Sequence, residues 1–184
     1  PQMLSFVSLP FYLEYQLGRS LQEPGLLITP WPLMVALMAV VSGRLSDRYP
    51  ASILAGAGLL MLSCGLLSLS LLGPDASSLD IAWRAAWCGI GFGFFQSPNN
   101  RAMIGATPRE RSGGASGAQA TTRLLGQTTG TAVVALMFSL DQQGAARMAL
   151  HVAAIVAGIG AAISLSRLRD RPIPASTTSA EPDA

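Results

Sequence analysis

Apolar residues occur along this chain in six long blocks that are separated by short polar connections. A helix needs about 20 predominantly apolar residues to cross about 30 Å of hydrocarbon. The pattern therefore predicts six transmembrane helices, over residues 2–17, 25–41, 51–72, 81–103, 114–140 and 147–168. The third block is the most uniform, with no charged residue among its 22 positions, and the fifth is the least apolar.

The chain starts at Pro1, inside the first apolar block and without a methionine or a basic n-region. We therefore expect no signal peptide, and we expect the chain to be the C-terminal part of a longer protein. The six blocks divide into two triplets, 2–72 and 81–168, although no residue-level repeat relates them.

The composition supports a membrane location. Half of the 184 residues are hydrophobic and 12% are charged, and the mean hydropathy of +0.43 is too apolar for a water-soluble domain of this size. All twelve basic residues are arginines placed around apolar blocks, so we exclude nucleic-acid binding. Cys64 and Cys88 fall inside apolar blocks, where we expect small buried hydrophobes rather than metal ligands or a disulfide.

The arginines predict the orientation, because short cytoplasmic connections are enriched in basic residues. Eight of them fall on one predicted side: Arg44, Arg48, Arg101, Arg109, Arg111, Arg167, Arg169 and Arg171. Three fall on the other, so we expect both ends of the chain in the cytoplasm. Five aromatic residues support this by lying near the outer helix ends: Tyr12, Tyr15, Trp31, Trp83 and Trp87. The Pro- and Ser-rich tail 169–184 is expected to be disordered cytoplasmic chain.

The connection between the second and third blocks has the sequence GRLSDR, from Gly43 to Arg48. It predicts a tight cytoplasmic turn, with Pro50 in the first turn of the next helix and Asp47 near the positive end of that helix. With Gly43, Arg44, Asp47 and Arg48, it resembles the loop signature of the major facilitator superfamily. In those transporters the loop belongs to the cytoplasmic gate, although the two residues after Arg48 depart from the signature.

A second set of residues makes the resemblance closer. It comprises Gly89, Gly91, Gly93, Pro98, Asn99, Asn100, Pro108, Gly113, Gly114, Ala115, Ser116, Gly117, Arg123, Gly126, Gly130 and Ala132. This pattern is similar to the last part of the fourteen-helix multidrug:proton antiporters of that superfamily. The resemblance implies an all-α membrane protein, whose residues 1–168 form the six transmembrane helices of the C-terminal half of a major facilitator fold.

The same resemblance implies a function and a location. It implies a multi-pass protein of the bacterial inner membrane with a cytoplasmic C-terminus, which alternates access by rocking against an N-terminal half. It also implies export of drugs or other small amphipathic molecules, with the proton gradient as energy source and no cofactor. We expect these six helices alone not to transport, because their cavity face has no covering half.

The GIGFG sequence over 89–93 is one residue short of the dinucleotide-binding fingerprint. It lies inside a continuous apolar block instead of at a strand-to-helix turn, so it implies no nucleotide site. We expect its glycines, and also Gly126 and Gly130, to let neighbouring helices approach closely.

Arg123 lies well inside the fifth block, about 14 Å along the helix axis. Inserting an arginine at that depth in a membrane costs roughly 2.5–3.5 kcal/mol on insertion scales. We therefore take Arg123 as a candidate functional residue. Gln119, Arg123, Gln127 and Thr131 recur every four residues, so their shared face must meet a partner helix or a water-filled cavity. A structural alternative stays open, in which Arg123 orders the helix ends by donating to backbone carbonyls or to Asp47.

The fourth block carries further polar residues. Gln96, Asn99 and Asn100 follow Phe92 on roughly one side, and Pro98 removes a backbone hydrogen bond beside them. Polar groups next to a broken membrane helix indicate a binding site. Asn99 and Asn100 would equally serve as hydrogen-bonding groups toward another helix.

Two isolated titratable residues have both a functional and a plain interpretation. Glu14, near the outer end of the first block, would titrate in proton coupling or would simply contact interfacial water. His151 has no metal-ligand partner three or four residues away, so we expect a non-catalytic role and no metal site. No nucleophile, base and orienting group can be assembled, so we expect no enzyme.

Two alternatives to the exporter remain at this point. A nutrient or metabolite permease of the same superfamily would share nearly every feature above. A truncated, non-transporting membrane scaffold would be a stable set of six helices with a bound partner protein.

Overall fold

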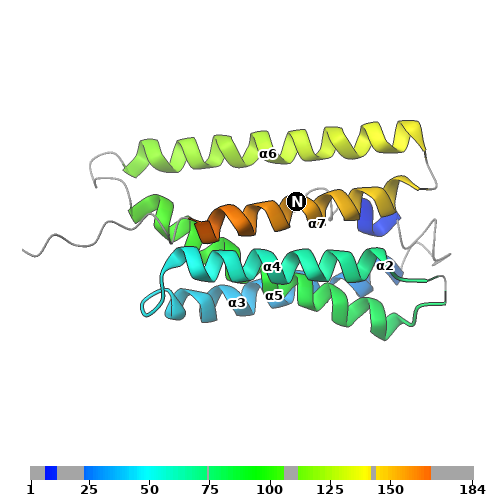
Figure 1. Cartoon of the computed structure of the whole chain (residues 1–184), viewed down its shortest axis with the longest axis horizontal. Helices are drawn as coiled ribbons and strands as arrows, with labels where there is room; N and C mark the ends of the chain where they lie inside the picture. The colour runs from blue at the N-terminus through cyan, green and yellow to red at the C-terminus, as the bar shows by residue number, and fades with distance from the viewer. Residues whose placement is uncertain (1–6, 12–22, 74, 106–111, 142–143, 167–184) are drawn as a thin grey trace, which may run out of the picture.

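The computed structural model describes residues 7–11, 23–73, 75–105, 112–141 and 144–166, and the regular elements in this part of the chain are all helices. Residues 7–11 are helical and are followed by α2 (Glu23–Ile28), α3 (Pro30–Leu45), α4 (Ala51–Ser70), α5 (Ser78–Gly105), α6 (Ser112–Leu140) and α7 (Ala145–Ser166). The long helices lie side by side, so the loop after α3 and the end of α5 share one end of the bundle (Figure 1). The predicted all-α fold is confirmed.

Four of the six predicted blocks match α4 to α7 to within three residues at each end. The second block, by contrast, is divided into α2 and α3 at Thr29, because Pro30 and Pro32 occupy the first turn of α3, where their missing N–H groups cost nothing. Most of the first block lies outside the described residues, as do Glu14, Arg109, Arg111 and the tail 169–184. The predicted division into a 1–168 bundle and a tail therefore stays a prediction.

Glycines allow α5 to pack closely against α4 on one side and against α3 on the other. A Cβ atom on Gly91 would lie 2.5 Å from the backbone nitrogen of Leu62 in α4, and one on Gly93 would lie 2.7 Å from the Cβ of Met38 in α3. Gly89 meets the carbonyl oxygen of Trp31 in the same way. Because residues two apart point to nearly opposite sides of a helix and residues four apart to the same side, the GIGFG spacing serves both contacts. The expected close approach of these glycines is confirmed.

The surface of α7 that packs against its neighbours is formed mainly by alanines. Its buried face is made of residues three and four apart: Ala146, Ala149, Ala153, Ala157 and Ala161. This face packs on α4, and hydroxyl groups add hydrogen bonds between helices. Ser63 Oγ donates to the Ala154 carbonyl at 2.8 Å, and Ser164 Oγ donates to the Ser52 carbonyl at 3.0 Å. Small residues and hydroxyl groups are the usual means of packing helices in lipid.

The helix α6 lies at the edge of the bundle, beside α7 (Figure 1). Most of its side chains are exposed, and Val134 is its one buried hydrophobic residue among those described. Gly126 has no atom of the described part of the chain within 4 Å of the position of a Cβ, so the expected close approach does not occur there.

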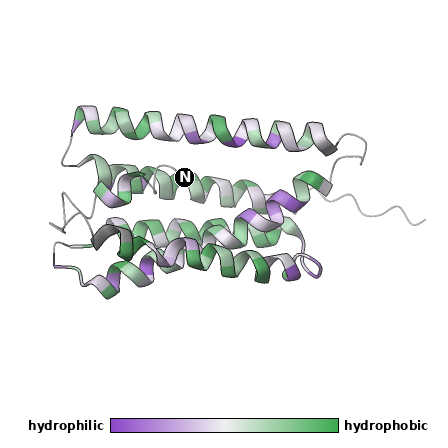
Figure 2. Ribbon diagram, turned by 180° about the vertical axis from the view of Figure 1, so that it is seen from behind, coloured by the Kyte–Doolittle hydropathy of each residue, from purple (hydrophilic) through white to green (hydrophobic). Residues whose placement is uncertain are grey.

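Within the described residues, three stretches are long and apolar enough by themselves to cross a membrane: Leu26–Leu45, Ala51–Ser70 and Ala145–Ser166. The helices α5 and α6 are longer, at 28 and 29 residues, but carry more polar positions. In Figure 2 the end of α5 and several turns of α6 are hydrophilic, whereas α4 and α7 are mostly hydrophobic. At 1.5 Å per residue α6 is about 43 Å long, more than a bilayer core is thick.

One sequence-based expectation on burial is wrong, and one buried aromatic residue was not foreseen. Trp31 is 2% exposed and belongs to the core between α3 and α5, whereas Trp83 and Trp87 are exposed. Cys64 is exposed on α4, whereas Cys88 is buried as expected. A helix that is apolar all round gives no sign of which side its neighbours cover.

Basic side chains cover the C-terminal turn of α4. Arg84 donates to the carbonyl of Ser68, and Arg147 Nε donates to the carbonyl of Ser70 at 2.8 Å. His151 Nε2 lies 3.4 Å from Ser70 Oγ. The last carbonyls of a helix lack partners within it and carry the negative end of its dipole, so these contacts stabilise the end of α4.

Candidate functional site

A cavity of about 490 Å³ lies between α4, α5, α6 and α7, and we call it the central cavity. Seven of the residues predicted from the fourth and fifth blocks line it: Phe92, Gln96, Asn99, Asn100, Gln119, Arg123 and Gln127. From the sequence, these residues were predicted on the faces of two separate helices. In the structure, both faces line the central cavity.

The α6 side of the cavity carries the predicted polar stripe except for its last member. Gln119, Arg123 and Gln127 line the cavity, whereas Thr131 donates its hydroxyl to the carbonyl of Gln127 at 3.0 Å and does not. Arg123 lies three residues before Gly126, the midpoint of α6, which is about 5 Å along the axis. Its guanidinium is exposed, and it has no hydrogen-bond or ion-pair partner within the described ranges.

The α5 side is joined to α6 by one hydrogen bond between side chains. Gln119 Nε2 donates to Asn100 Oδ1 at 2.7 Å, so Asn100 does bond to another helix. Asn99 instead contacts Met103 Sδ of its own helix at 3.8 Å. The helix α5 continues past Pro98 to Gly105, although the missing N–H of Pro98 leaves the carbonyl one turn earlier without its usual donor.

The apolar wall of the central cavity was not predicted from the sequence. It is formed by Leu59 of α4, Phe95 and Met103 of α5, and Val156 and Ile163 of α7. The Phe92 and Phe95 rings are tilted, with centroids 6.1 Å apart. Apolar residues in an apolar helix carry no sign of whether they face lipid, core or a cavity, so no sequence signal would have found them.

A second cavity, of about 560 Å³, lies between α3 and α5. We call it the side cavity. Phe92, Gln96 and Asn100, spaced four residues apart on α5, line both cavities. This face of α5 therefore separates the two spaces and contributes polar groups to each.

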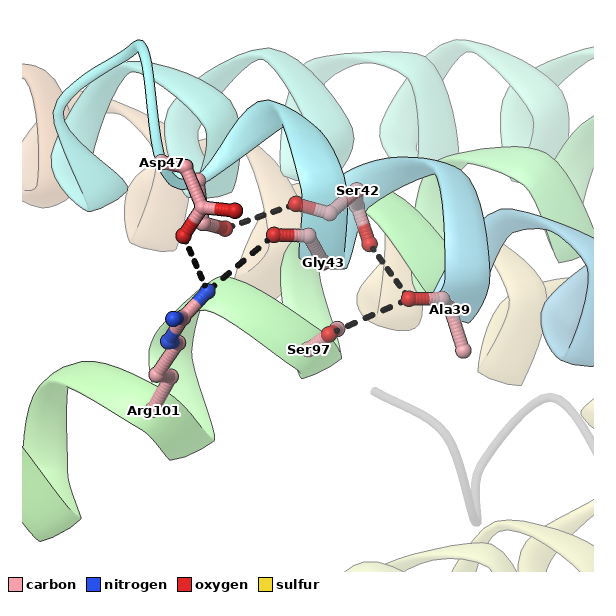
Figure 3. A network of polar contacts seen from close by, with 7 residues as sticks. Ala39, Ser42, Gly43, Asp47, Ser97 and Arg101 are labelled. Atoms are coloured by element: carbon pink, nitrogen blue, oxygen red, sulfur yellow. Dashed lines mark hydrogen bonds and ion pairs between the residues drawn. The ribbon is translucent and has the colours of Figure 1, made fainter.

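The loop after α3 is held by an arginine from α5 (Figure 3). Arg101 Nη1 lies 2.8 Å from Asp47 Oδ1 and donates to the Gly43 carbonyl at 3.2 Å. Gly43 and Arg44 belong to the last turn of α3, not to the loop as we expected, and Arg44 and Arg48 are exposed. From the sequence, Arg101 contributed only to the predicted orientation of the helices, and its contact with Asp47 was not predicted.

The Asp47 carboxylate pairs with Arg101, and the N-cap of α4 is Pro50, with no side-chain hydrogen bond to the helix end. The alternative in which Asp47 holds Arg123 is therefore wrong, because Arg123 has no ion-pair partner in the described part of the chain. The pair between Asp47 and Arg101 was not predicted, since the end of α5 is brought to the loop by tertiary packing.

Further hydrogen bonds join α3 and α5 beside this ion pair, and Figure 3 shows the one between Ser97 and Ala39. Ser97 Oγ donates to the Ala39 carbonyl at 3.4 Å, and Ser42 Oγ donates to the Gly93 carbonyl at 3.3 Å. Arg101 thus lies at the loop end of a row of contacts between helices that starts beside the side cavity.

Residues that would hold a metal ion do not occur together in the described part of the chain, where no group of three His, Cys, Asp or Glu side chains is found. His151 is placed between Ser70 Oγ and the carbonyl of Arg147, away from both cavities.

Membrane-length helices around a partly polar cavity are the architecture of a membrane transport protein. Residues 2–184 match the model of the Major Facilitator Superfamily, and the chain belongs to this family. This confirms the resemblance to that superfamily.

The chain is similar to parts of several longer curated proteins. The chain is 50% identical over 167 residues to the uncharacterized transporter YebQ of Escherichia coli K12, which is 91% of the chain and 36% of that protein. It is 30% identical to the riboflavin transporter RibZ of Clostridioides difficile, covering 85% of the chain and 34% of the relative. It is 33% identical to the multidrug resistance protein Stp of Mycobacterium tuberculosis, covering 67% and 23%. The chain thus spans about a third of the length of YebQ and RibZ.

Proposed function

We propose that this chain is the C-terminal six-helix half of a proton-coupled antiporter that exports amphipathic small molecules across the bacterial inner membrane. The central cavity carries the proposal, because it combines a wall of aromatic and aliphatic side chains with one arginine and several amides. Cavities that bind small molecules typically have this mixture, in which apolar surface gives affinity and a few polar groups fix orientation.

The position of Arg123 supports a water-filled pathway. A charged side chain near the middle of a membrane helix faces the bundle interior or a hydrated cavity, and Arg123 lines the central cavity. In transporters of this architecture the substrate binds near the midplane, between two halves that rock against each other. The proposed partner is therefore an N-terminal half that covers the open side of α6.

The proposal also includes the coupling and the orientation. The proton gradient is the energy source and no cofactor is needed, and Glu14 is the proposed titrating group, although it lies outside the described residues. The C-terminus is proposed to be cytoplasmic, which is supported by the arginines at the loop end of the bundle, Arg44, Arg48 and Arg101.

A second candidate is a metabolite permease of the same superfamily. The similarity to a riboflavin transporter favours it, since that relative is named for a vitamin and not for drug resistance. The two candidates predict opposite directions of movement across the membrane, so one vesicle experiment separates them.

The experiment uses the complete transporter, expressed in a bacterium that lacks its main efflux pumps. Inside-out membrane vesicles with an acidified lumen are expected to accumulate a fluorescent amphipathic dye, and a protonophore is expected to abolish the accumulation. Uptake of riboflavin into whole cells, without dye accumulation in the vesicles, would support the permease. Movement of neither compound would refute both candidates.

The contact between Arg101 and Asp47 gives a second prediction. Both side chains are more than 60% exposed, so the ion pair contributes about 0.2–1 kcal/mol to stability. Asp47→Asn and Arg101→Gln are therefore expected to leave the melting temperature nearly unchanged, while each slows transport severalfold by releasing the loop from α5. The two changes remove the same contact, so the double variant is expected to be no slower than either single one.

The measurement is the initial rate of transport beside the melting temperature of each purified variant. Arg44→Gln is a comparison in the last turn of α3, since the Arg44 side chain is exposed and forms no ion pair with Asp47. The Asp47 N–H donates to the backbone carbonyl of Arg44, and this substitution keeps that carbonyl. Losses that multiply in the double variant would show that Asp47 and Arg101 act independently and would contradict a shared gate contact.

A further inference from the structure

The two cavities have an unusual balance of charge. Among the described residues that line them, Arg123 is the single charged side chain, and the remaining polar groups are amides and hydroxyls. The described aspartates lie at helix ends instead: Asp47 in the loop after α3, Asp75 and Asp80 around the start of α5, and Asp141 after α6. The described walls therefore carry positive charge that no carboxylate balances.

The amides beside Arg123 leave its guanidinium available to a ligand. Gln119, one turn before it, donates to Asn100, and Gln127, one turn after it, lines the same cavity. A guanidinium presents several N–H donors in one plane, which match the two oxygens of a carboxylate. Amides on either side of it supply further donors to the same oxygens without adding negative charge.

The opposite wall suits the rest of such a ligand. Phe92, Phe95 and Met103 of α5 form an aromatic and polarizable surface beside Leu59 of α4. Flat apolar groups pack well on aromatic rings and on methionine sulfur. This wall also lowers the local dielectric constant, so that the charge of Arg123 attracts an anion and repels a cation more strongly than in water.

We propose that the central cavity selects amphipathic organic anions, with a carboxylate bound by Arg123 between Gln119 and Gln127 and an aromatic body packed on Phe92 and Phe95. The inference rests on the proposed transport function and names its substrate class. A site built for cationic drugs would instead need a carboxylate in the wall, and none of the described lining residues supplies one.

The test compares two xanthene dyes of similar size and opposite charge, the anion fluorescein and the cation rhodamine 123. The complete transporter is reconstituted in proteoliposomes, and KM is measured for each dye under a proton gradient. The wild type is expected to have a KM for fluorescein about tenfold below that for rhodamine 123, a modest effect for one charge at contact distance. Arg123→Gln is expected to raise the KM for fluorescein about tenfold and to leave that for rhodamine 123 unchanged or lower.

Two further variants separate charge from folding. Arg123→Lys keeps the charge and is expected to keep the preference for fluorescein. Gln127→Glu places a carboxylate one turn from Arg123 and is expected to weaken fluorescein transport in the same way as Arg123→Gln. A preference of the wild type for rhodamine 123, or an equal change of both KM values in Arg123→Gln, would overturn the inference.

Binding is measured separately, by fluorescence anisotropy of each dye with the purified transporter. Tighter binding of fluorescein that is lost in Arg123→Gln supports the anion site even where no dye moves with the proton gradient. In that case the proposed export function fails and the anion site stands. Equal binding of both dyes overturns the anion site, whatever the transport assay gives.

Discussion

The Gly91→Ala variant is expected to destabilise the folded bundle by about 3 kcal/mol, the upper part of the usual range for an overpacked site. The added Cβ would lie 2.5 Å from the Leu62 nitrogen and 2.8 Å from the Gly58 oxygen. Both are backbone atoms, so no side-chain rotation relieves the clash and α4 and α5 must separate. The measurement is the melting temperature of the purified complete transporter, which should fall by several degrees, together with its yield.

The effect is expected to be large because α5 is held on two sides. Moving α5 away from α4 pushes Gly89 and Gly93 into α3, where their contacts are equally close. Gly117→Ala on α6 is the matched control, since no described atom lies within 4 Å of a Cβ there and alanine favours helix by about 1 kcal/mol over glycine. Equal losses in the two variants would contradict backbone contact as the cause.

The Arg123→Ala variant is expected to reach the membrane in normal amount and to transport at less than about a tenth of the wild-type rate, since one lost charge contact is worth an order of magnitude. Arg123 has no described partner, so its removal leaves no buried group unpaired and no packing defect. What is lost is the charge in the central cavity. The measurements are membrane abundance and the transport of the anionic dye fluorescein.

Arg84→Ala provides the contrasting control on α5. Arg84 donates to the Ser68 carbonyl at the end of α4, and its Nε is buried, so the change is expected to lower the melting temperature. The two variants are therefore expected to differ: Arg123→Ala should impair transport, and Arg84→Ala should lower stability. Transport at the wild-type rate by Arg123→Ala would refute a role of this residue in the pathway.

The sequence predicted where the long helices lie because hydrocarbon allows few solutions. A chain that crosses a bilayer must satisfy its backbone hydrogen bonds internally, so a long apolar block becomes a helix almost regardless of detail. Polar positions were informative for the same reason. Arg123 and the amides near it could not face lipid, and this constraint was enough to predict that they face a cavity or a partner helix.

Apolar positions were much less informative. Nothing in the pattern predicted that Trp31 is buried against α5, and Cys64 was expected to be buried and is exposed. Lipid and protein interior are both apolar, so the side of a membrane helix that meets its neighbours has no distinct hydrophobic pattern. The exceptions were glycines, since their spacing on α5 predicted close approach.

The sequence by itself thus determined the helical membrane fold, most helix boundaries and the polar residues that avoid lipid, since desolvation of backbone and charge acts on each segment separately. Tertiary structure alone decided which residues meet: Arg101 with Asp47, Gln119 with Asn100, and the α5 and α6 polar faces around one cavity. These pairings depend on how each helix is rotated and shifted against its neighbours. That is set by contacts between glycines, alanines and backbone atoms far apart in the chain, which no single segment encodes.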